Sequence, residues 1–161
     1  MVLKIVVLNG PNLNRLGKRR PERYGTTTLQ DVVDGLSLLG EQLGTEIHHM
    51  QSNHEGELID FIHANMDADG VLVNPAGLTL YGRPLLDAVG DLQKPIAVVH
   101  IAQLYKIGDI YGPDTKDHWK AIGDVYVCGL GVHGYNAALL RLVELITGKP
   151  AQFRIVSSAT A

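Results

Sequence analysis

The sequence predicts an α/β fold in which helices cover both faces of a parallel β-sheet. Short runs of Val, Ile and Leu alternate with longer segments whose apolar residues recur at helical spacing. These runs end in polar turns, as strands do before the crossover helices of a parallel sheet. The length of 161 residues suits one domain with a single sizeable core. We therefore expect one domain over residues 1–161, with any ligand site beyond the carboxyl ends of the strands.

Five apolar runs are the predicted strands. They are expected at residues 2–8, 45–50, 70–73, 95–101 and 124–128. The first run is interrupted by Lys4 and stops at the turn of Asn9 and Gly10. It is too short to cross a membrane, and no signal-peptide cleavage pattern accompanies it.

Four helices are predicted between and after these strands. They are expected near residues 29–43, 58–66, 85–92 and 135–146. Thr27 and Gln30 form a possible capping box for the first helix, and Gly44 is placed to end it. Asn53 is a candidate cap for the second helix.

The composition argues against several classes of protein. A formal net charge of -3 gives no basic surface for nucleic acid and no polybasic patch for a membrane. Cys128 is the single cysteine, so a disulfide within the chain is impossible, which suits a reducing compartment. We therefore expect a cytoplasmic protein with no nucleic-acid or membrane partner. The small and polar residues at about 150–161 predict a flexible tail.

Two polar clusters follow the first predicted strand. Residues 9–14 contain three asparagines, which either build a turn or present side-chain amides to a ligand. Arg19, Arg20 and Arg23 then lie close in sequence to Tyr24, and this group is either a solvated loop with a packing anchor or a catalytic group. A free phenol titrates near pH 10, and nearby guanidinium groups favour the phenolate. The second interpretation therefore makes Tyr24 a general base.

Three later segments also have structural and functional interpretations. His54 and Glu57 invite a metal site, but no third ligand is evident, so we expect no metal. His100 ends the fourth strand and is either a buried structural residue or an acid–base group. Residues 129–134 read G-L-G-V-H-G, which fits the dinucleotide fingerprint, but no further strand with an acidic end follows. We interpret these glycines as a tight turn with close helix packing.

Several motifs spread over almost the whole chain match one known family. They are Asn9-Gly-Pro-Asn-Leu-Asn, Arg19, Tyr24-Gly25, Gln51-Ser-Asn-His-Glu-Gly-Glu-Leu-Ile-Asp60, Asn74-Pro75, Asp87-Ala88, Pro95 to His100, and Gly129-Leu130-Gly131. In these residues the chain resembles the type II 3-dehydroquinate dehydratases, and residues 51–60 are highly specific. The resemblance implies a flavodoxin-like three-layer sandwich with a five-stranded parallel sheet. It also implies a dodecamer of four trimers, without metal or organic cofactor.

The resemblance implies a catalytic role for four residues. Tyr24 is the base that removes a proton next to a ketone, and Arg19 favours its phenolate form. Asn12 helps to stabilise the resulting enolate. His100 is the acid that protonates the departing hydroxyl group. Elimination of water is therefore the expected reaction.

A second set of residues is implied in substrate binding. Asn74 and the backbone amides of Ile101 and Ala102 would hold the substrate carboxylate. Asp87 lies in a further matching segment and is predicted to belong to the same set.

Other positions depart from the family pattern. Leu80 replaces a histidine, Val98 replaces the acid that orients the catalytic histidine, and Ala102 replaces a serine. Ile107 replaces an arginine, and Arg20 replaces a glutamate. Each lost polar partner would leave a buried substrate hydroxyl unpaired, at a cost of about 1–3 kcal/mol. Leu80 and Ile107 would instead suit a flatter, less hydroxylated ligand.

The sequence therefore predicts a type II dehydroquinase-like lyase. Its small-molecule substrate is a carboxylated ring ketone, either 3-dehydroquinate or, as the replacements favour, a less hydroxylated relative. The alternative is a non-catalytic paralogue that binds a small carboxylate or assembles with an active partner. Retention of the whole catalytic set argues against it, because a scaffold has no need of these residues.

Overall fold

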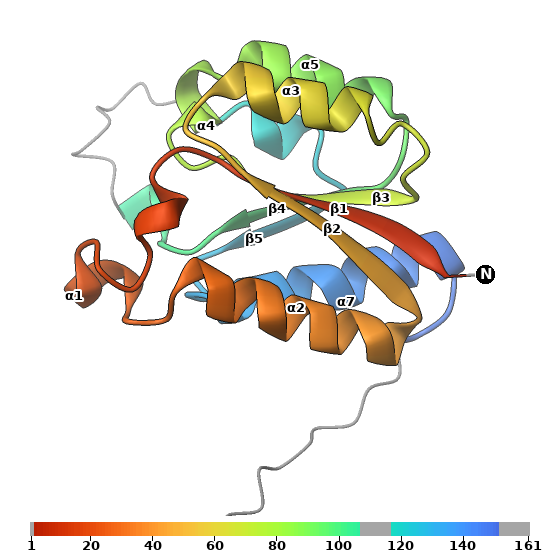
Figure 1. Cartoon of the computed structure of the whole chain (residues 1–161), viewed down its shortest axis with the longest axis horizontal. Helices are drawn as coiled ribbons and strands as arrows, with labels where there is room; N and C mark the ends of the chain where they lie inside the picture. The colour runs from red at the N-terminus through yellow and green to blue at the C-terminus, as the bar shows by residue number, and fades with distance from the viewer. Residues whose placement is uncertain (1, 107–116, 152–161) are drawn as a thin grey trace, which may run out of the picture.

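Five parallel strands form the middle layer of the computed structural model, which describes residues 2–106 and 117–151 (Figure 1). They are β1 (Leu3–Asn9), β2 (Thr45–Gln51), β3 (Gly70–Asn74), β4 (Ile96–His100) and β5 (Val125–Cys128), in the order β2-β1-β3-β4-β5. The predicted α/β fold is confirmed, and each strand lies within about one residue of its predicted bounds. Most of the predicted tail lies outside the described residues.

Helices form the two outer layers. Figure 1 shows α2 (Leu29–Leu43) and α7 (His133–Thr147) on one face of the sheet, and α3 (Glu55–His63) and α5 (Arg83–Asp91) on the other. Shorter elements are η1 (Leu13–Arg15), α1 (Pro21–Tyr24), α4 (Leu78–Tyr81), η2 (Leu104–Lys106) and η3 (Trp119–Ala121). Among the described residues, no helix has the length and apolar character needed to span a membrane.

The core is divided by the sheet into two halves. Along β1, Ile5 and Val7 pack on the side of α2 and α7, whereas Val6 and Leu8 pack on the side of α3 and α5. All four side chains are fully buried. Burial on both faces explains why β1, β3 and β4 are nearly continuous apolar runs, whereas the edge strand β2 is mostly half-buried and contains polar residues.

The helix boundaries correct three predictions. The capping box of α2 is formed by Thr28 and Asp31, whose side chains each accept a hydrogen bond from the other's backbone, and not by Thr27 and Gln30. Helix α3 begins at Glu55, and its capping position holds His54 without a side-chain bond. Asn53 therefore does not cap it. Met66 lies beyond α3 and is 46% exposed. The predicted end of α2 at Gly44 is confirmed.

The strand order reverses between β1 and β3, inside the sheet. After β1 the chain crosses to β2 at the edge and then returns to pair β3 on the other side of β1. Asn9 at the end of β1 pairs in register with Gln51 of β2 and Asn74 of β3. The helices leave in opposite directions here, so a crevice opens beyond these strand ends.

Candidate active site

A cleft of about 280 Å³ opens beyond the carboxyl ends of β1, β3 and β4. Its lining includes all four predicted catalytic residues and three of the predicted substrate-binding residues, namely Tyr24, Arg19, Asn12, His100, Asn74, Ile101 and Ala102. The structure thus brings together seven residues from three segments of the chain.

The loop after β1 is held tightly against the loop after β3. The backbone N–H of Gly10 donates to the carbonyl of Asn74 at 2.8 Å, and a Cβ on Gly10 would lie 2.3 Å from the carbonyl oxygen of Pro75. Only glycine allows this approach. Asn12 has a φ of 69°, a left-handed conformation that asparagine tolerates, and its N–H donates to Asn53 Oδ1 at 2.8 Å. The backbone at Asn12 is therefore fixed from two sides.

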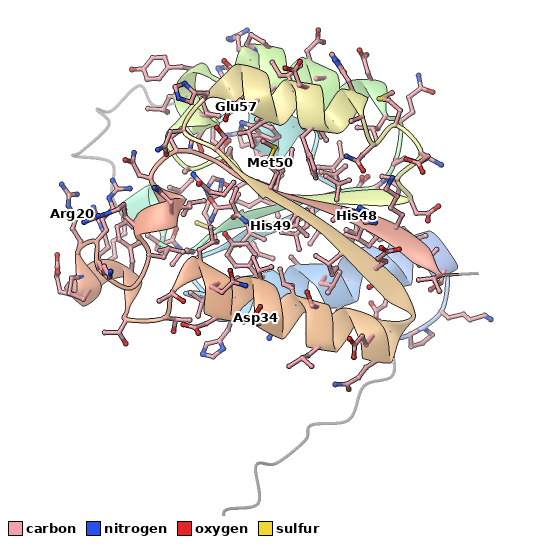
Figure 2. All side chains as sticks on the ribbon, viewed as in Figure 1. Arg20, Asp34, His48, His49, Met50 and Glu57 are labelled. Atoms are coloured by element: carbon pink, nitrogen blue, oxygen red, sulfur yellow. The ribbon has the colours of Figure 1, made fainter. Side chains whose placement is uncertain are left out.

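Tyr24 lies at the end of α1 beside two guanidinium groups. The Cζ atom of Arg19 is 5.6 Å from the centroid of its ring, and that of Arg23 is 5.9 Å away. Both distances are within the range of cation–π contacts. Arg20 is exposed on the preceding loop (Figure 2) and is absent from the cleft lining. Two cations therefore lie beside one half-buried phenol, and of the two only Arg19 lines the cleft itself.

A buried hydrogen-bond chain supports the cleft from below. The hydroxyl of Tyr135 on α7 accepts from Asn74 Nδ2 at 2.8 Å and donates to Asn9 Oδ1 at 2.5 Å. Burial raises the pKa of Tyr135, so its phenol stays neutral. Asn74 Oδ1 accepts from the N–H of Ala76 at 3.1 Å. The amide of Asn74 is thereby oriented, and one Nδ2 hydrogen remains for a ligand.

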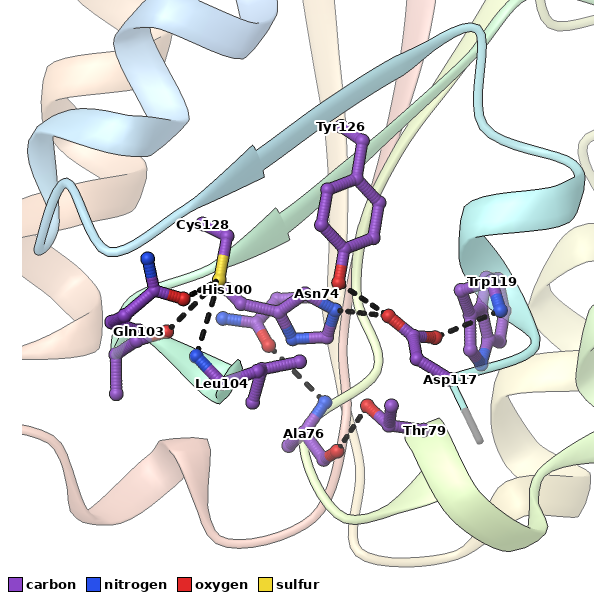
Figure 3. A network of polar contacts seen from close by, with 11 residues as sticks. Asn74, Ala76, Thr79, His100, Gln103, Leu104, Asp117, Trp119, Tyr126 and Cys128 are labelled. Carbon is purple, nitrogen blue, oxygen red and sulfur yellow. Dashed lines mark hydrogen bonds and ion pairs between the residues drawn. The ribbon is translucent and has the colours of Figure 1, made fainter. Parts of the chain in front are cut away.

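His100 is buried at the end of β4, with only 3% of its surface exposed. Its Nε2 lies 3.5 Å from Asp117 Oδ2, and its ring centroid lies 5.4 Å from that of Tyr126. Asp117 also accepts hydrogen bonds from the Tyr126 hydroxyl and from the N–H of Trp119 (Figure 3). Burial acts to raise the pKa of Asp117, but contacts with His100 and Tyr126 outweigh it and hold that pKa below its ordinary value.

The chain matches the model of one protein family, described as dehydroquinase class II, over residues 3–143. The chain belongs to the class II dehydroquinase family. A 3-dehydroquinate dehydratase of Halothermothrix orenii is 41% identical over 147 residues, which cover 89% of this chain and 95% of that protein. The predicted enzyme class, a lyase that acts as a dehydratase, is thereby confirmed.

Solved dehydroquinases share the fold. The crystal structure of a type II dehydroquinase from Propionibacterium acnes superposes with a TM-score of 0.78 at 34% identity and covers 89% of this chain and 97% of that one. The enzyme from Butyrivibrio crossotus superposes with a TM-score of 0.81 at 29% identity, covering 88% and 97%. These likenesses agree with the flavodoxin-like architecture expected from the sequence.

Two further residues of the predicted dehydroquinase site, Leu80 and Asp87, lie apart from the cleft, and a third cannot be placed relative to it. Leu80 on α4 lines a small cavity with Trp119 and Arg83 instead, because the short helix turns its side chain toward α5 and η3. Asp87 is exposed on α5. Ile107 lies outside the described residues. The structure therefore does not bring Leu80 or Asp87 to the cleft that this chain forms, and their substrate roles stay predictions.

The structure adds residues that sequence reasoning did not select. Leu13, Leu16 and Leu104 supply apolar lining on the short 3-10 elements, which are too short for a periodic signal. Asp117 and Tyr126 were missed because they belong to no matching motif. Tyr135, near the start of the last helix, was also missed, because nothing in the sequence indicated that its hydroxyl would be buried and hydrogen-bonded.

The two remaining motifs have structural explanations. Glu57 accepts a hydrogen bond from the hydroxyl of Ser52, and the described residues contain no group of three or more potential metal ligands. Gly129 and Gly131 both have positive φ, and their N–H groups donate to the carbonyls of His100 and Ile101. A Cβ on Gly134 would lie 3.1 Å from Val127, which indicates close packing of α7 on the sheet. The predicted tight turn and close helix packing are confirmed.

Proposed function

We propose that this dehydratase eliminates water from a carboxylated ring ketone with Tyr24 as the base. The substrate is 3-dehydroquinate or, as we favour, a less hydroxylated relative. One observation carries the proposal. Tyr24, with two guanidinium groups about its ring, shares a single cleft with Asn74 and His100. A cationic environment favours a phenolate, and a phenolate at the mouth of a cleft is a suitable base for a carbon acid.

The proposed reaction needs two proton transfers. The Tyr24 phenolate removes a proton from the carbon next to the ketone, and the electron pair moves to the ketone oxygen to form an enolate. Asn12 stabilises this oxygen by hydrogen bonding. Collapse of the enolate then expels the hydroxyl group on the β-carbon, and His100 supplies the proton that releases it as water. Both steps use only side chains of the cleft.

The lining supports a carboxylate and a largely apolar ring. The free Nδ2 hydrogen of Asn74, with the backbone amides of Ile101 and Ala102, is suited to a carboxylate. Leu13, Leu16 and Leu104 offer no partner for a hydroxyl group. A buried hydroxyl without a partner costs about 1–3 kcal/mol, so apolar lining favours the less hydroxylated substrate.

Steady-state turnover of 3-dehydroquinate and a panel of cyclic keto acids tests the proposal directly. The conjugated product absorbs in the ultraviolet, so product formation can be followed continuously. We expect kcat/KM to be higher for a less hydroxylated ring ketone than for 3-dehydroquinate. Turnover of 3-dehydroquinate at the highest efficiency of the panel would overturn the altered specificity. Binding of ring ketones without any turnover would favour the non-catalytic alternative.

The proposed assembly is the dodecamer implied by the resemblance. Light scattering of the purified protein should give a mass near twelve times 17.5 kDa. A monomeric mass at assay concentrations would contradict this assembly. It would also mean that Asp87, which is exposed, has no neighbouring subunit to contact.

A further inference from the structure

The residue two positions before His100 on the same strand, Val98, is apolar. Side chains two residues apart on a strand lie on the same face, so Val98 and His100 share one side of β4. Val98 is fully buried in the apolar cluster that also contains Trp119. It offers no acceptor to the imidazole. In the resemblance described above, this is the position of the acid that orients the histidine.

The environment of His100 nevertheless contains a carboxylate. Asp117 precedes η3 and is only 8% exposed. Its Oδ1 accepts from the N–H of Trp119 at 2.9 Å, and the side chain of Trp119 is fully buried. This backbone bond and the buried indole anchor the carboxylate at the side of β4. Its Oδ2 then lies 3.5 Å from Nε2 of His100.

Tyr126 completes the arrangement from the neighbouring strand. It pairs in register with Val98, and its hydroxyl donates to Asp117 Oδ2. A carboxylate oxygen can accept two hydrogen bonds, so the bond from Tyr126 leaves capacity for the imidazole. The ring of Tyr126 is also tilted by 50° against that of His100. The three side chains thus come from β4, β5 and the segment before η3.

The hydrogen bonding of the His100 imidazole is incomplete at Nε2 among the described residues. His100 Nε2 is buried and makes no hydrogen bond within the described part of the chain, where Asp117 Oδ2 stands 3.5 Å away as an ion-pair contact. A buried polar atom in this state is costly, and such atoms are rare in native proteins. A movement of about 0.5 Å would bring Nε2 and Asp117 Oδ2 to the usual separation for an N–H donor and an oxygen acceptor. No such bond is available from Val98.

We propose that Asp117, held by Tyr126 and the Trp119 backbone, is the positioning residue that orients His100 in place of an acid at position 98. Its carboxylate accepts from Nε2–H and so fixes the ring orientation and, in the neutral ring, the tautomer. When the ring carries both protons, Nδ1–H is the donor that remains for the departing hydroxyl group. Asp117 does not line the cleft and acts only through His100. The inference rests on the proposed role of His100 for its catalytic consequence, but not for its structural one.

The test compares Asp117→Asn with Asp91→Asn, a matched change at an exposed position on the end of α5. The amide oxygen of Asn can still accept from the Trp119 N–H, so the fold should be retained. The first measurement is the ¹⁵N NMR spectrum of the histidine rings, with the His100 signals assigned by comparison with His100→Gln. We expect the Nε2–H tautomer in the wild type and a mixture of tautomers in Asp117→Asn. Unchanged His100 signals would overturn the proposal.

The second measurement is turnover. Loss of an orienting partner should lower kcat by roughly 10- to 100-fold with little change in KM. Tyr126→Phe keeps the aromatic packing and should lower kcat by less than about 10-fold, with a smaller change in the His100 signals. This variant also provides the test if Asp117→Asn fails to fold, and an unchanged His100 spectrum would then overturn the proposal.

The two measurements separate this inference from the proposed function. If the tautomer changes but no carboxylated ring ketone is turned over by the wild type, Asp117 positions His100 and the proposed reaction is wrong. If the wild type is active and Asp117→Asn has the same kcat, the reaction stands and the positioning role is overturned.

Discussion

The two sides of the cleft are built on different principles. On the side of β1 and β3, the residues are those of the family motifs, and short contacts between neighbouring loops hold them in place. On the side of β4 and β5, His100 is retained but the acid expected two residues earlier is absent. A carboxylate from a separate segment, Asp117, stands beside the imidazole instead. The difference shows that His100 can have a carboxylate beside its ring even though the residue two positions earlier on its strand is apolar.

The largest expected effect is at Tyr24, on the β1 and β3 side of the cleft. Tyr24→Phe keeps the ring beside Arg19 and removes only the titrating oxygen. Turnover of the true substrate should fall by roughly 10²- to 10⁴-fold, the usual contribution of a positioned acid–base group, while stability changes little. Tyr81→Phe is the matched control, because that ring is 80% exposed. Equal kcat for wild type and Tyr24→Phe would end the proposed mechanism.

The next effect concerns the buried support of the same side. Tyr135→Phe preserves the packing of α7 but leaves Asn9 Oδ1 and Asn74 Nδ2 without their shared partner. Unsatisfied buried groups cost about 1–3 kcal/mol each, so the loss of both bonds should lower the free energy of unfolding by roughly 2–6 kcal/mol. Denaturant unfolding measures it. A variant as stable as the wild type would show that the chain of three side chains is not a stabilising unit.

Acid should reduce the stability that Asp117 contributes on the β4 and β5 side of the cleft. The pKa of Asp117 is lower in the folded protein than its ordinary value near 3.9. Its carboxylate therefore stabilises the fold at pH values above about 4, and this contribution is lost as the pH falls through the lower folded value. Urea unfolding of wild type and Asp117→Asn at pH 7 and near pH 3 should show a stability difference that shrinks on acidification. A difference that is constant with pH would contradict this.

The smallest expected effect concerns the backbone of Ala76, two residues after Asn74. Ala76 has a φ of 50°, which costs a non-glycine residue about 1–2 kcal/mol, and the mutation to glycine also gives the unfolded chain more freedom. Ala76→Gly should therefore raise the free energy of unfolding by about 0.5 kcal/mol. Gly77→Ala is the control, because Gly77 has a right-handed conformation and a Cβ there meets nothing within 4 Å. Thermal unfolding of both variants checks the sign.

The sequence alone determined the sheet and much of the β1 and β3 side of the cleft. The central strands β1, β3 and β4 are buried on both faces over most of their length, so their apolar runs are continuous and end where the backbone leaves the sheet. Asn12, Asn74 and His100 each follow or end such a run, and parallel strands bring those ends to one edge. Strand ends are local features, which is why they could be located without coordinates.

Only the tertiary structure decided which side chains meet. Tyr135 reaches Asn9 across 126 residues of sequence, and Asp117 reaches His100 from a segment with no motif of its own. Leu80 directly follows the buried Thr79 in α4, yet it lines the cavity beside Trp119 rather than the cleft. These contacts depend on how helices pack on the sheet. The spacing of residues along the chain does not indicate that packing, because each contact joins elements that are separate in sequence and meet only in the folded core.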